Sequence, residues 1–372
     1  MKKSAQKTIC IVMGGHFSAT LGGAQFQAKC VVEALKVSKK FKIYYLARMI
    51  NPKYDPTGYK IMQIAEPVGI RRYGFAFDTR KLLNLLREIN PDVIYQRGLK
   101  SYTGVIAYYA KKTGCRSVFH ISSDYNLLPL YLKGRSRIQW LRWLEKRMGE
   151  YGLRNADCVI AQTKYQADLL ERNYGRVATA VVPNFHPMPN EVLVKSSDII
   201  RVIWVGNFKS VKQPEAFVRL AGDLAYRGDL RFVMIGHGGN QKKYAKLHAE
   251  IERMPNLSHL GEQPIEEVNR QLAAGHIFVN TSRAEGFPNT FIQAWMRQVP
   301  TLSLGVNPDG ILSSEEFGFS AKTYESLRDK LLELADNREL RDRMGRRSQQ
   351  HSFEVHSPKA AERLIAILDD IG

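Results

Sequence analysis

Short apolar runs that alternate with helical patterns restrict the fold of this chain more than any other feature of its sequence. TICIVM at 8–13, DVIYQ at 92–96 and RVIWVG at 201–206 are three such runs, and a segment with helical spacing follows each of them. Strands that are apolar on both faces belong to parallel sheets, because right-handed crossovers place helices over both faces. We therefore predict an α/β protein with two doubly wound parallel-sheet domains that face one another across a cleft.

The same alternation continues along the chain, and no repeat or low-complexity segment interrupts it. The predicted strands are 8–13, 41–47, 92–96, 116–121, 157–162, 179–183, 201–206, 231–236, 257–261, 276–281 and 301–305. The predicted helices are 23–38, 79–89, 101–112, 136–153, 164–173, 213–226, 240–252, 265–273 and 290–297.

The length of 372 residues allows two domains, each with its own core. A polar stretch at 191–200 follows the turn signal Val182-Pro183-Asn184 and marks the division. We place the first domain at 1–190 and the second at 196–352.

The whole excess of positive charge lies in the first half of the chain. Residues 1–195 contain 32 Lys and Arg against 13 Asp and Glu, whereas residues 196–372 contain 23 of each kind. Such asymmetry predicts an anionic partner for the first half, which could be nucleic acid, a membrane surface or an acidic substrate.

A basic segment with two tryptophans, at 131–154, has the densest charge and the spacing of a helix with one packed face. Arginines neutralise anionic headgroups and indoles prefer the apolar–polar boundary, so we favour contact with a membrane surface. A solvated helix with buried tryptophans and a nucleic-acid surface are the alternatives, although no nucleic-acid-binding signature accompanies the charge. The candidate contact residues are Arg135, Arg137, Trp140, Arg142, Trp143, Lys146 and Arg147.

The sequence contains no run that predicts export or a membrane span, since TICIVM is too short for a signal peptide. Its four cysteines are widely spread without a C-x-x-C pair, which indicates a reducing compartment. We expect a cytoplasmic protein, with a peripheral position on the inner face of the cytoplasmic membrane as a further option. No cluster has metal-ligand spacing, so neither a metal nor another cofactor is expected.

Ligands of doubly wound sheets bind at the carboxyl ends of the strands, where helix N-termini present free amides. The informative loops are therefore 14–25, 122–124, 207–212 and 282–289. In the first loop, Gly22 and Gly23 open a helix and allow close approach of an anion such as a diphosphate, although a glycine pair also suits a tight turn. No G-x-G-x-x-G or P-loop motif occurs.

Lys212 lies just before the helix expected near Pro214 and can reach back to a phosphate. There it would compensate the charge of a leaving pyrophosphate without a metal. An exposed loop lysine is the structural alternative, and Lys209 is a possible substitute.

The segment EGFPNT at 285–290 is the sharpest feature of the second half. Its carboxylate can accept hydrogen bonds from sugar hydroxyls, the amides of 286–289 can donate to sugar or phosphate oxygens, and Gln293 can bond to ribose hydroxyls. A helix-capping carboxylate is the structural alternative. The candidates are Glu285, Gly286, Phe287, Pro288, Asn289, Thr290 and Gln293.

Two further candidates lie at the end of the apolar strand RSVFHI (116–121), His120 within it and Asp124 just beyond it. His120 could bond to a donor-sugar hydroxyl beside the reacting carbon, although a histidine at a strand end is often structural. Asp124 is a candidate for the acceptor side.

Taken in order, these residues resemble glycosyltransferase family 4, retaining sugar transferases of the GT-B fold with two Rossmann-like domains. The resemblance is carried by Gly22-Gly23-Ala24, Pro91-Asp92-Val93-Ile94, Ala156 to Ala161, Val182-Pro183-Asn184, Val205-Gly206 with Lys212, Ile235-Gly236-His237-Gly238 and Glu285 to Asn289. The last segment is highly specific, and the order of the others strengthens the match.

The resemblance implies that the second domain binds a nucleoside-diphosphate sugar and that the basic first domain takes the acceptor. It implies that Lys212 pairs with the diphosphate, that Glu285 contacts the hexose and that His120 lines the reaction centre. It also implies that a C-terminal helix at 357–372 packs back on the first domain.

Two positions depart from the family pattern. The usual Gly-Arg is Gly206-Asn207, so one phosphate cation is missing and Lys212 must carry more of the charge. The second glutamate of the E-x7-E pattern is Gln293, which disfavours any mechanism that needs a second carboxylate.

We therefore expect a retaining, metal-independent hexosyltransferase that uses a UDP- or GDP-linked sugar and a saccharide acceptor. The basic helix favours a lipid-linked acceptor, as in the assembly of a bacterial surface polysaccharide or a glycolipid. The alternatives are a nucleotide-sugar epimerase or hydrolase on the same fold and a non-catalytic binder of anionic surfaces.

Overall fold

A computed structural model describes residues 6–19, 22–68, 75–128, 137–191, 195–196 and 198–371. The chain divides into two compact units. The first consists of Met1–Phe185 with Pro358–Gly372, and the second of His186–Ser357.

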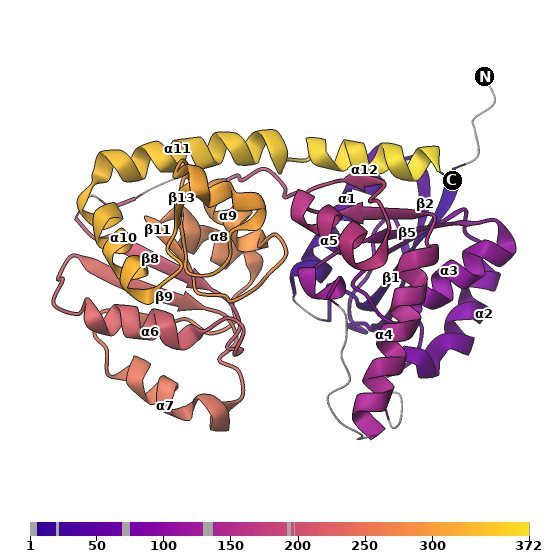
Figure 1. Ribbon diagram of the computed structural model, residues 1–372, viewed down its shortest axis with the longest axis horizontal. Coiled ribbons are helices and arrows are strands. Elements are labelled where there is room, and N and C mark those ends of the chain that lie inside the picture. Colours follow the sequence, from indigo (N-terminus) through magenta and orange to yellow (C-terminus); the bar gives the residue numbers. More distant parts are fainter. Residues whose placement is uncertain are drawn as a thin grey trace. The chain divides into compact units, whose positions relative to one another are not determined.

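The first unit contains a seven-stranded, entirely parallel sheet (Figure 1). Its strands are β1 (Lys7–Gly15), β2 (Phe41–Met49), β3 (Lys60–Gln63), β4 (Val93–Arg97), β5 (Arg116–His120), β6 (Cys158–Ala161) and β7 (Ala180–Val181). They lie in the order β3-β2-β1-β4-β5-β6-β7. Its helices are α1 (Gly23–Ser38), α2 (Thr79–Ile89), α3 (Ser101–Thr113), α4 (Arg137–Asn155), α5 (Lys164–Tyr174) and α12 (Lys359–Asp370).

Alternate residues of β1 explain why helices cover both faces of this sheet. Ile9 and Ile11 are buried in the cluster that includes α1 and α12, whereas Cys10 and Val12 are buried against α2 and α3. Successive side chains of a strand point to opposite faces, so an uninterrupted apolar strand needs a helical layer on each side.

Helix α12 belongs to the first unit although the second unit precedes it in the chain. Ala361, Leu364 and Leu368 are buried in the same cluster as Val31 and Leu35 of α1, and the two helices lie side by side (Figure 1). Their spacing of three and four residues places them on one face of α12.

Helices α3 and α4 cross at unusually short range because glycines form the contact. A Cβ atom on Gly104 or Gly152 would lie 2.3 Å or 2.2 Å from backbone atoms of the opposing helix. Glu145 of α4 adds a polar anchor, since its Oε1 accepts hydrogen bonds from the amide of Ala76 (2.6 Å) and the hydroxyl of Ser101 (3.0 Å). The position of α4 is therefore fixed by both packing and hydrogen bonds.

The second unit contains a six-stranded parallel sheet in the order β10-β9-β8-β11-β12-β13. Its strands are β8 (Ile200–Val205), β9 (Leu230–Ile235), β10 (Leu257–His259), β11 (Ile277–Asn280), β12 (Thr301–Ser303) and β13 (Gly318–Ser320). Its helices are α6 (Pro214–Asp223), α7 (Gln241–Glu252), α8 (Ile265–Ala273), α9 (Asn289–Trp295), α10 (Tyr324–Asp336) and α11 (Arg338–Val355). Val202 and Trp204 of β8 pack against α6, whereas Ile203 packs against α8 and α9.

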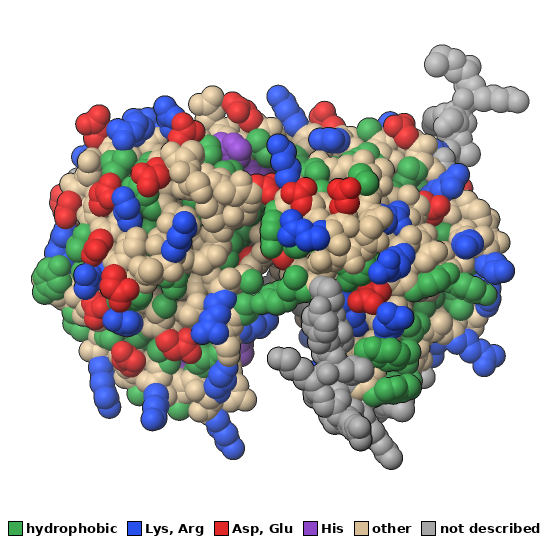
Figure 2. Space-filling model, in the orientation of Figure 1, with side chains coloured by type: hydrophobic (Ala, Val, Ile, Leu, Met, Phe, Trp, Pro, Cys, Tyr) green, Lys and Arg blue, Asp and Glu red, His purple; other side chains and the backbone are tan. Residues whose placement is uncertain are grey.

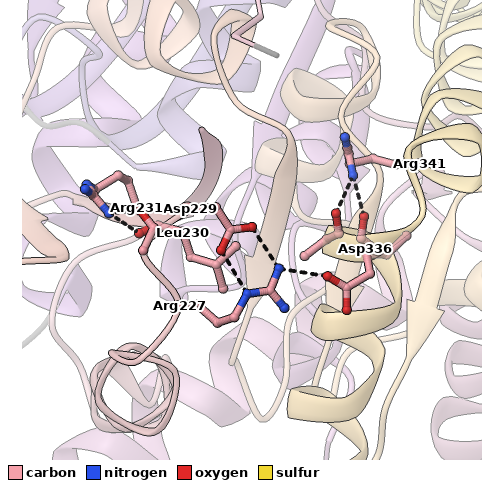
Figure 3. A network of polar contacts seen from close by, with 9 residues as sticks. Arg227, Asp229, Leu230, Arg231, Asp336 and Arg341 are labelled. Atoms are coloured by element: carbon pink, nitrogen blue, oxygen red, sulfur yellow. Dashed lines mark hydrogen bonds and ion pairs between the residues drawn. The ribbon is translucent and has the colours of Figure 1, made fainter. Parts of the chain in front are cut away.

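Ion pairs and hydrogen bonds of arginine side chains connect the turn before β9 with the end of α10. Arg227 donates to both carboxylate oxygens of Asp229 (2.8 Å each) and to Asp336 at the end of α10 (2.7 Å), and Arg341 donates to the last carbonyl oxygens of α10 (Figure 3). These contacts stabilise turns at the amino edge of the sheet. The candidate site lies at the opposite edge, where the strands have their carboxyl ends.

Candidate functional site

The loops that follow β8 and β11 bring Lys212 and Glu285 together at the carboxyl edge of the second sheet. Lys212 Nζ lies 2.7 Å from Glu285 Oε2, and the two side chains are 26% and 16% exposed. The loops are also joined by backbone contacts, since Thr281 Oγ1 donates to the Lys212 carbonyl at 2.7 Å and the Arg283 amide donates to Val211 at 2.8 Å. The two loops that carry the ion pair are therefore held together by hydrogen bonds of their own.

Buried polar groups under these loops orient the Glu285 carboxylate. Asn280, the last residue of β11, donates its Nδ2 to Glu285 Oε1 at 3.0 Å and accepts the amide of Ser282 at 3.0 Å. Trp204 Nε1 donates to Thr281 Oγ1 at 2.9 Å. One carboxylate oxygen thus faces Asn280 and the other faces the lysine. Glu285 does not cap α9, because the N-cap position of that helix is Pro288.

The turn after Lys212 has a constrained backbone. The Lys212 amide donates to the Lys209 carbonyl at 2.8 Å, and Gln213 has φ 46°, in the left-handed region, before α6 begins at Pro214. A non-glycine residue there stores conformational energy, and such residues cluster at binding sites.

Asn207 joins the loop after β8 to the loop after β9. Its Oδ1 accepts the amide of His237 at 2.9 Å, and the Phe208 amide donates to the His237 carbonyl at 2.9 Å. Gly236 has φ 138°, and a Cβ atom there would lie 2.1 Å from the carbonyl oxygen of Gly206. The carboxamide at the position of the usual arginine is therefore used to join two loops of the site.

Two histidines support the loop after β9 from below. His248 and His259 stack on Phe208, with ring centroids 5.3 Å and 4.9 Å away. Their Nε2 atoms lie 3.0 Å from the Gly238 carbonyl and 2.9 Å from the Gly236 carbonyl. Burial lowers the pKa of His259, which favours the neutral ring that donates from Nε2.

The other candidates of the 285–290 segment, and Gln293, are buried or half-buried. Phe287 is 9% exposed and packs edge-on against Trp295, and Asn289 Oδ1 lies 3.2 Å from His186 Nε2. Gln293 is 5% exposed, and its Nε2 donates to Asn269 Oδ1 at 3.0 Å. Gly286 and Thr290, the other candidates of this segment, are half-buried.

In the first unit, His120 is fully buried at the end of β5. Its Nδ1 lies 2.8 Å from the Tyr95 hydroxyl and its Nε2 lies 3.2 Å from the Val182 carbonyl. Burial, with a smaller contribution from Arg97, holds its pKa well below the usual value. Asp124 begins a short 3-10 helix, and its Oδ1 accepts a hydrogen bond from Gln166 at 2.9 Å.

The glycine pair and the basic helix lie where the sequence predicts them. Gly22, with extended backbone, is the N-cap of α1, and Gly23 is the first residue of that helix. On α4, Trp140 is 56% exposed, and Trp143 lies under the guanidinium of Arg147 at 5.8 Å. Arg142 is exposed, whereas Arg135 and the Arg137 side chain lie outside the described residues.

Lys146 differs from its neighbours on α4. Its Nζ donates to the Asn126 carbonyl at 2.9 Å, and burial lowers its pKa. This lysine therefore has a partner within the unit.

Sequence reasoning missed Asn280 and Thr281, which hold the ion pair in place. The sequence could have indicated them, because Asn280 and Thr281 are polar residues at the end of the apolar run HIFVNT. Polar residues at the carboxyl end of a parallel strand are typical of binding sites. Across the described part of the chain, no three His, Cys, Asp or Glu side chains form a group that could hold a metal ion. None of the described helices is long and apolar enough to cross a membrane.

Two family models match the chain, and each covers a different unit. Glycosyltransferase Family 4 matches residues 22–186, and Glycosyl transferases group 1 matches residues 190–351. The chain belongs to these glycosyltransferases, with a family 4 first unit and a group 1 second unit.

Known proteins agree with this assignment. An uncharacterized glycosyltransferase of Methanocaldococcus jannaschii, MJ1178, is 24% identical over 97% of this chain and 98% of its own length. Sucrose-phosphate synthase from Thermosynechococcus elongatus superposes with a TM-score of 0.78 at 13% identity, over 98% of each chain. Anabaena HepE in complex with UDP-glucose gives 0.71 at 16% identity, over 97% of this chain and 98% of that one. The two parallel-sheet units are those of the GT-B fold.

Proposed function

We propose that the protein transfers a hexose from a UDP- or GDP-linked sugar to a saccharide acceptor, with retention of the anomeric configuration and without a metal. The ion pair between Lys212 and Glu285 carries this proposal, because it joins the two charges that such a donor requires. When the donor binds, the ammonium exchanges the carboxylate for the diphosphate, and the carboxylate accepts hydrogen bonds from the hexose hydroxyls.

Departure of the diphosphate is the step that these residues assist. Negative charge grows on the β-phosphate as the glycosidic bond breaks, and a cation fixed in a half-buried loop stabilises that charge without reorganising. The backbone amides of 286–289 would assist, and Gln293 would offer its remaining amide oxygen to the ribose. The acceptor hydroxyl attacks from the same face and passes its proton to the leaving phosphate, so no second carboxylate is needed.

The first unit takes the acceptor in this proposal, with Gly22 and Gly23 near the diphosphate and Asp124 on the acceptor side. His120 would contact the sugar only after its 3.2 Å bond to the Val182 carbonyl opens. HepE was solved with UDP-glucose, which supports a UDP-linked donor. The basic α4 supports a lipid-linked acceptor and a peripheral membrane position in the cytoplasm.

The reaction itself tests the proposal. UDP-hexoses and GDP-hexoses are incubated with the protein, with and without a lipid extract as acceptor source, and the product's anomeric configuration is read by proton NMR. Transfer that requires the extract and retains the configuration supports the proposal. Release of free hexose without acceptor indicates a hydrolase, an altered nucleotide sugar indicates an epimerase, and an inverted product overturns the retaining mechanism.

A further inference from the structure

An apolar groove of about 400 Å³ lies on the first unit between α2, α3 and α4. Leu83, Val105, Tyr108, Met148 and Tyr151 line it, and nearly all of its surface is apolar. Tyr108 and Tyr151 remain 49% and 42% exposed. Large aromatic side chains left open beside an apolar hollow indicate a binding surface.

The groove is preformed rather than a gap that the helices could close. Its floor includes Gly104, at the glycine crossing of α3 and α4 described above. The helices already touch through their backbones there, and Glu145 anchors α4 to Ser101. Its shape therefore does not depend on a bound partner.

Positive charge predominates on the three helices that form the groove. Figure 2 shows hydrophobic side chains interspersed with Lys and Arg on this side of the first unit. Among the described residues of α2, α3 and α4, Glu88 is the one exposed carboxylate. The exposed cations are Arg80, Lys81, Arg87, Lys111, Lys112, Arg142, Arg147 and Arg154.

The lining restricts the chemistry of the occupant. An extended peptide or a nucleic-acid segment in this groove would leave backbone or base polar groups without partners, which is unfavourable. A hydrocarbon chain needs no such partners, and burial of its CH2 groups is favourable. The cations on these helices match an anionic headgroup layer.

We propose that this groove admits an acyl chain of an anionic phospholipid and holds the first unit on a negatively charged bilayer. Arg147 lines the groove, and its guanidinium pairs with Glu150 at 3.6 Å. Because 64% of the Arg147 side chain is still exposed, the guanidinium can also meet the phosphate while the chain enters beside Tyr108 and Tyr151. The proposal goes beyond the predicted contact between the tryptophans of α4 and a membrane surface, because it assigns a binding site to one lipid acyl chain. The groove is separate from the donor loops, so it can be tested independently of sugar transfer.

Sedimentation with vesicles tests the groove. Full-length protein is mixed with phosphatidylcholine vesicles that contain or lack phosphatidylglycerol, at low and at physiological salt. The test variant is Tyr108→Ser with Tyr151→Ser, and the matched control is Tyr165→Ser with Tyr226→Ser, two tyrosines outside the groove that are 48% and 72% exposed. All four side chains are exposed, and thermal unfolding confirms that both variants fold.

The wild type and the control are expected to bind the phosphatidylglycerol vesicles, and the groove variant is expected to bind at least tenfold more weakly. Arg147→Gln should weaken binding as well, chiefly at low salt. Equal binding by the groove variant and the wild type, or loss in the control too, overturns the proposal. If the groove variant binds vesicles normally but no longer transfers sugar to lipid acceptors, the groove binds the acceptor instead. That result also overturns the proposal. Stabilisation by UDP or GDP, measured in parallel, reports on the donor site separately.

Discussion

Asn280 donates its Nδ2 to one oxygen of Glu285 while Lys212 holds the other, so the carboxylate is fixed from both sides. The Asn280 side-chain amide comes from the buried end of a strand, whereas the Lys212 ammonium comes from a loop, and each holds one carboxylate oxygen. The amide is part of the scaffold, whereas the ammonium is on a side chain that can change partner when a phosphate arrives.

Replacing Lys212 by Gln should lower turnover by about two to three orders of magnitude, the usual effect of removing one fixed charge-stabilising donor. The measurement is the transfer rate at saturating donor. Lys209→Gln is the control, because this exposed lysine lies on the same loop. If Lys209→Gln abolishes turnover and Lys212→Gln does not, the phosphate cation has been assigned to the wrong residue.

Replacing His248 by Phe should weaken binding of UDP or GDP by about three- to tenfold, since one hydrogen bond of roughly 1 kcal/mol to the loop after β9 is lost. The phenyl ring keeps the stack on Phe208, so the variant isolates the bond to the Gly238 carbonyl. His248→Gln retains a donor near the same place and should bind like the wild type. Calorimetric titration with each diphosphate, and with the free nucleoside for comparison, measures the effect. Equal affinity in the Phe variant would show that the loop does not need this bond.

Acid should destabilise the protein through its buried neutral histidines. His276 accepts the Arg201 amide on Nδ1 at 3.1 Å and lies 2.9 Å from the Ser196 carbonyl on Nε2, and burial lowers its pKa to about 4. Below about pH 6.5 the unfolded chain binds a proton that the folded chain does not. The contribution of His276 is therefore complete above pH 6.5 and is lost as the pH falls toward 4.

Urea unfolding at pH 7 and pH 5 measures this loss, which should be roughly 1–2 kcal/mol for one such group. His276→Asn should reduce the difference between the two pH values. A difference as large as that of the wild type would assign the acid sensitivity to other groups.

Replacing Gly152 by Ala should destabilise the first unit by about 1–3 kcal/mol, because the new methyl group would lie 2.2 Å from the backbone of α3. Gly228→Ala is the control, since no neighbouring atom lies within 4 Å of a Cβ there. Thermal unfolding of both variants decides the matter. A neutral Gly152→Ala would mean that α4 can move away from α3 at little cost, and the groove would then lose its fixed wall.

The sheet architecture could be predicted because its central strands are apolar on both faces, as β1 and β8 illustrate. The edge strands could not. β3 is four half-exposed or exposed residues, and β13 is three residues that begin at Gly318 with φ 138°. Helix α11 has no apolar stripe to detect, since its buried positions include Arg341 and Ser348.

The candidate site was predictable in part. Lys212 and Glu285 follow from the rule that functional loops lie at the carboxyl ends of parallel strands, and the structure joins them directly. The partners of His120 and Asn207 lie 25 to 62 residues away in the chain, so no local pattern could reveal them.

Because α12 contributes Ala361, Leu364 and Leu368 to the core of the first unit, that unit is assembled from segments that precede and follow the second unit in the chain. During synthesis one face of its sheet therefore stays incompletely covered until the second unit and α12 have been translated. Loss of the last fifteen residues would therefore remove a side of a folding domain rather than a dispensable tail.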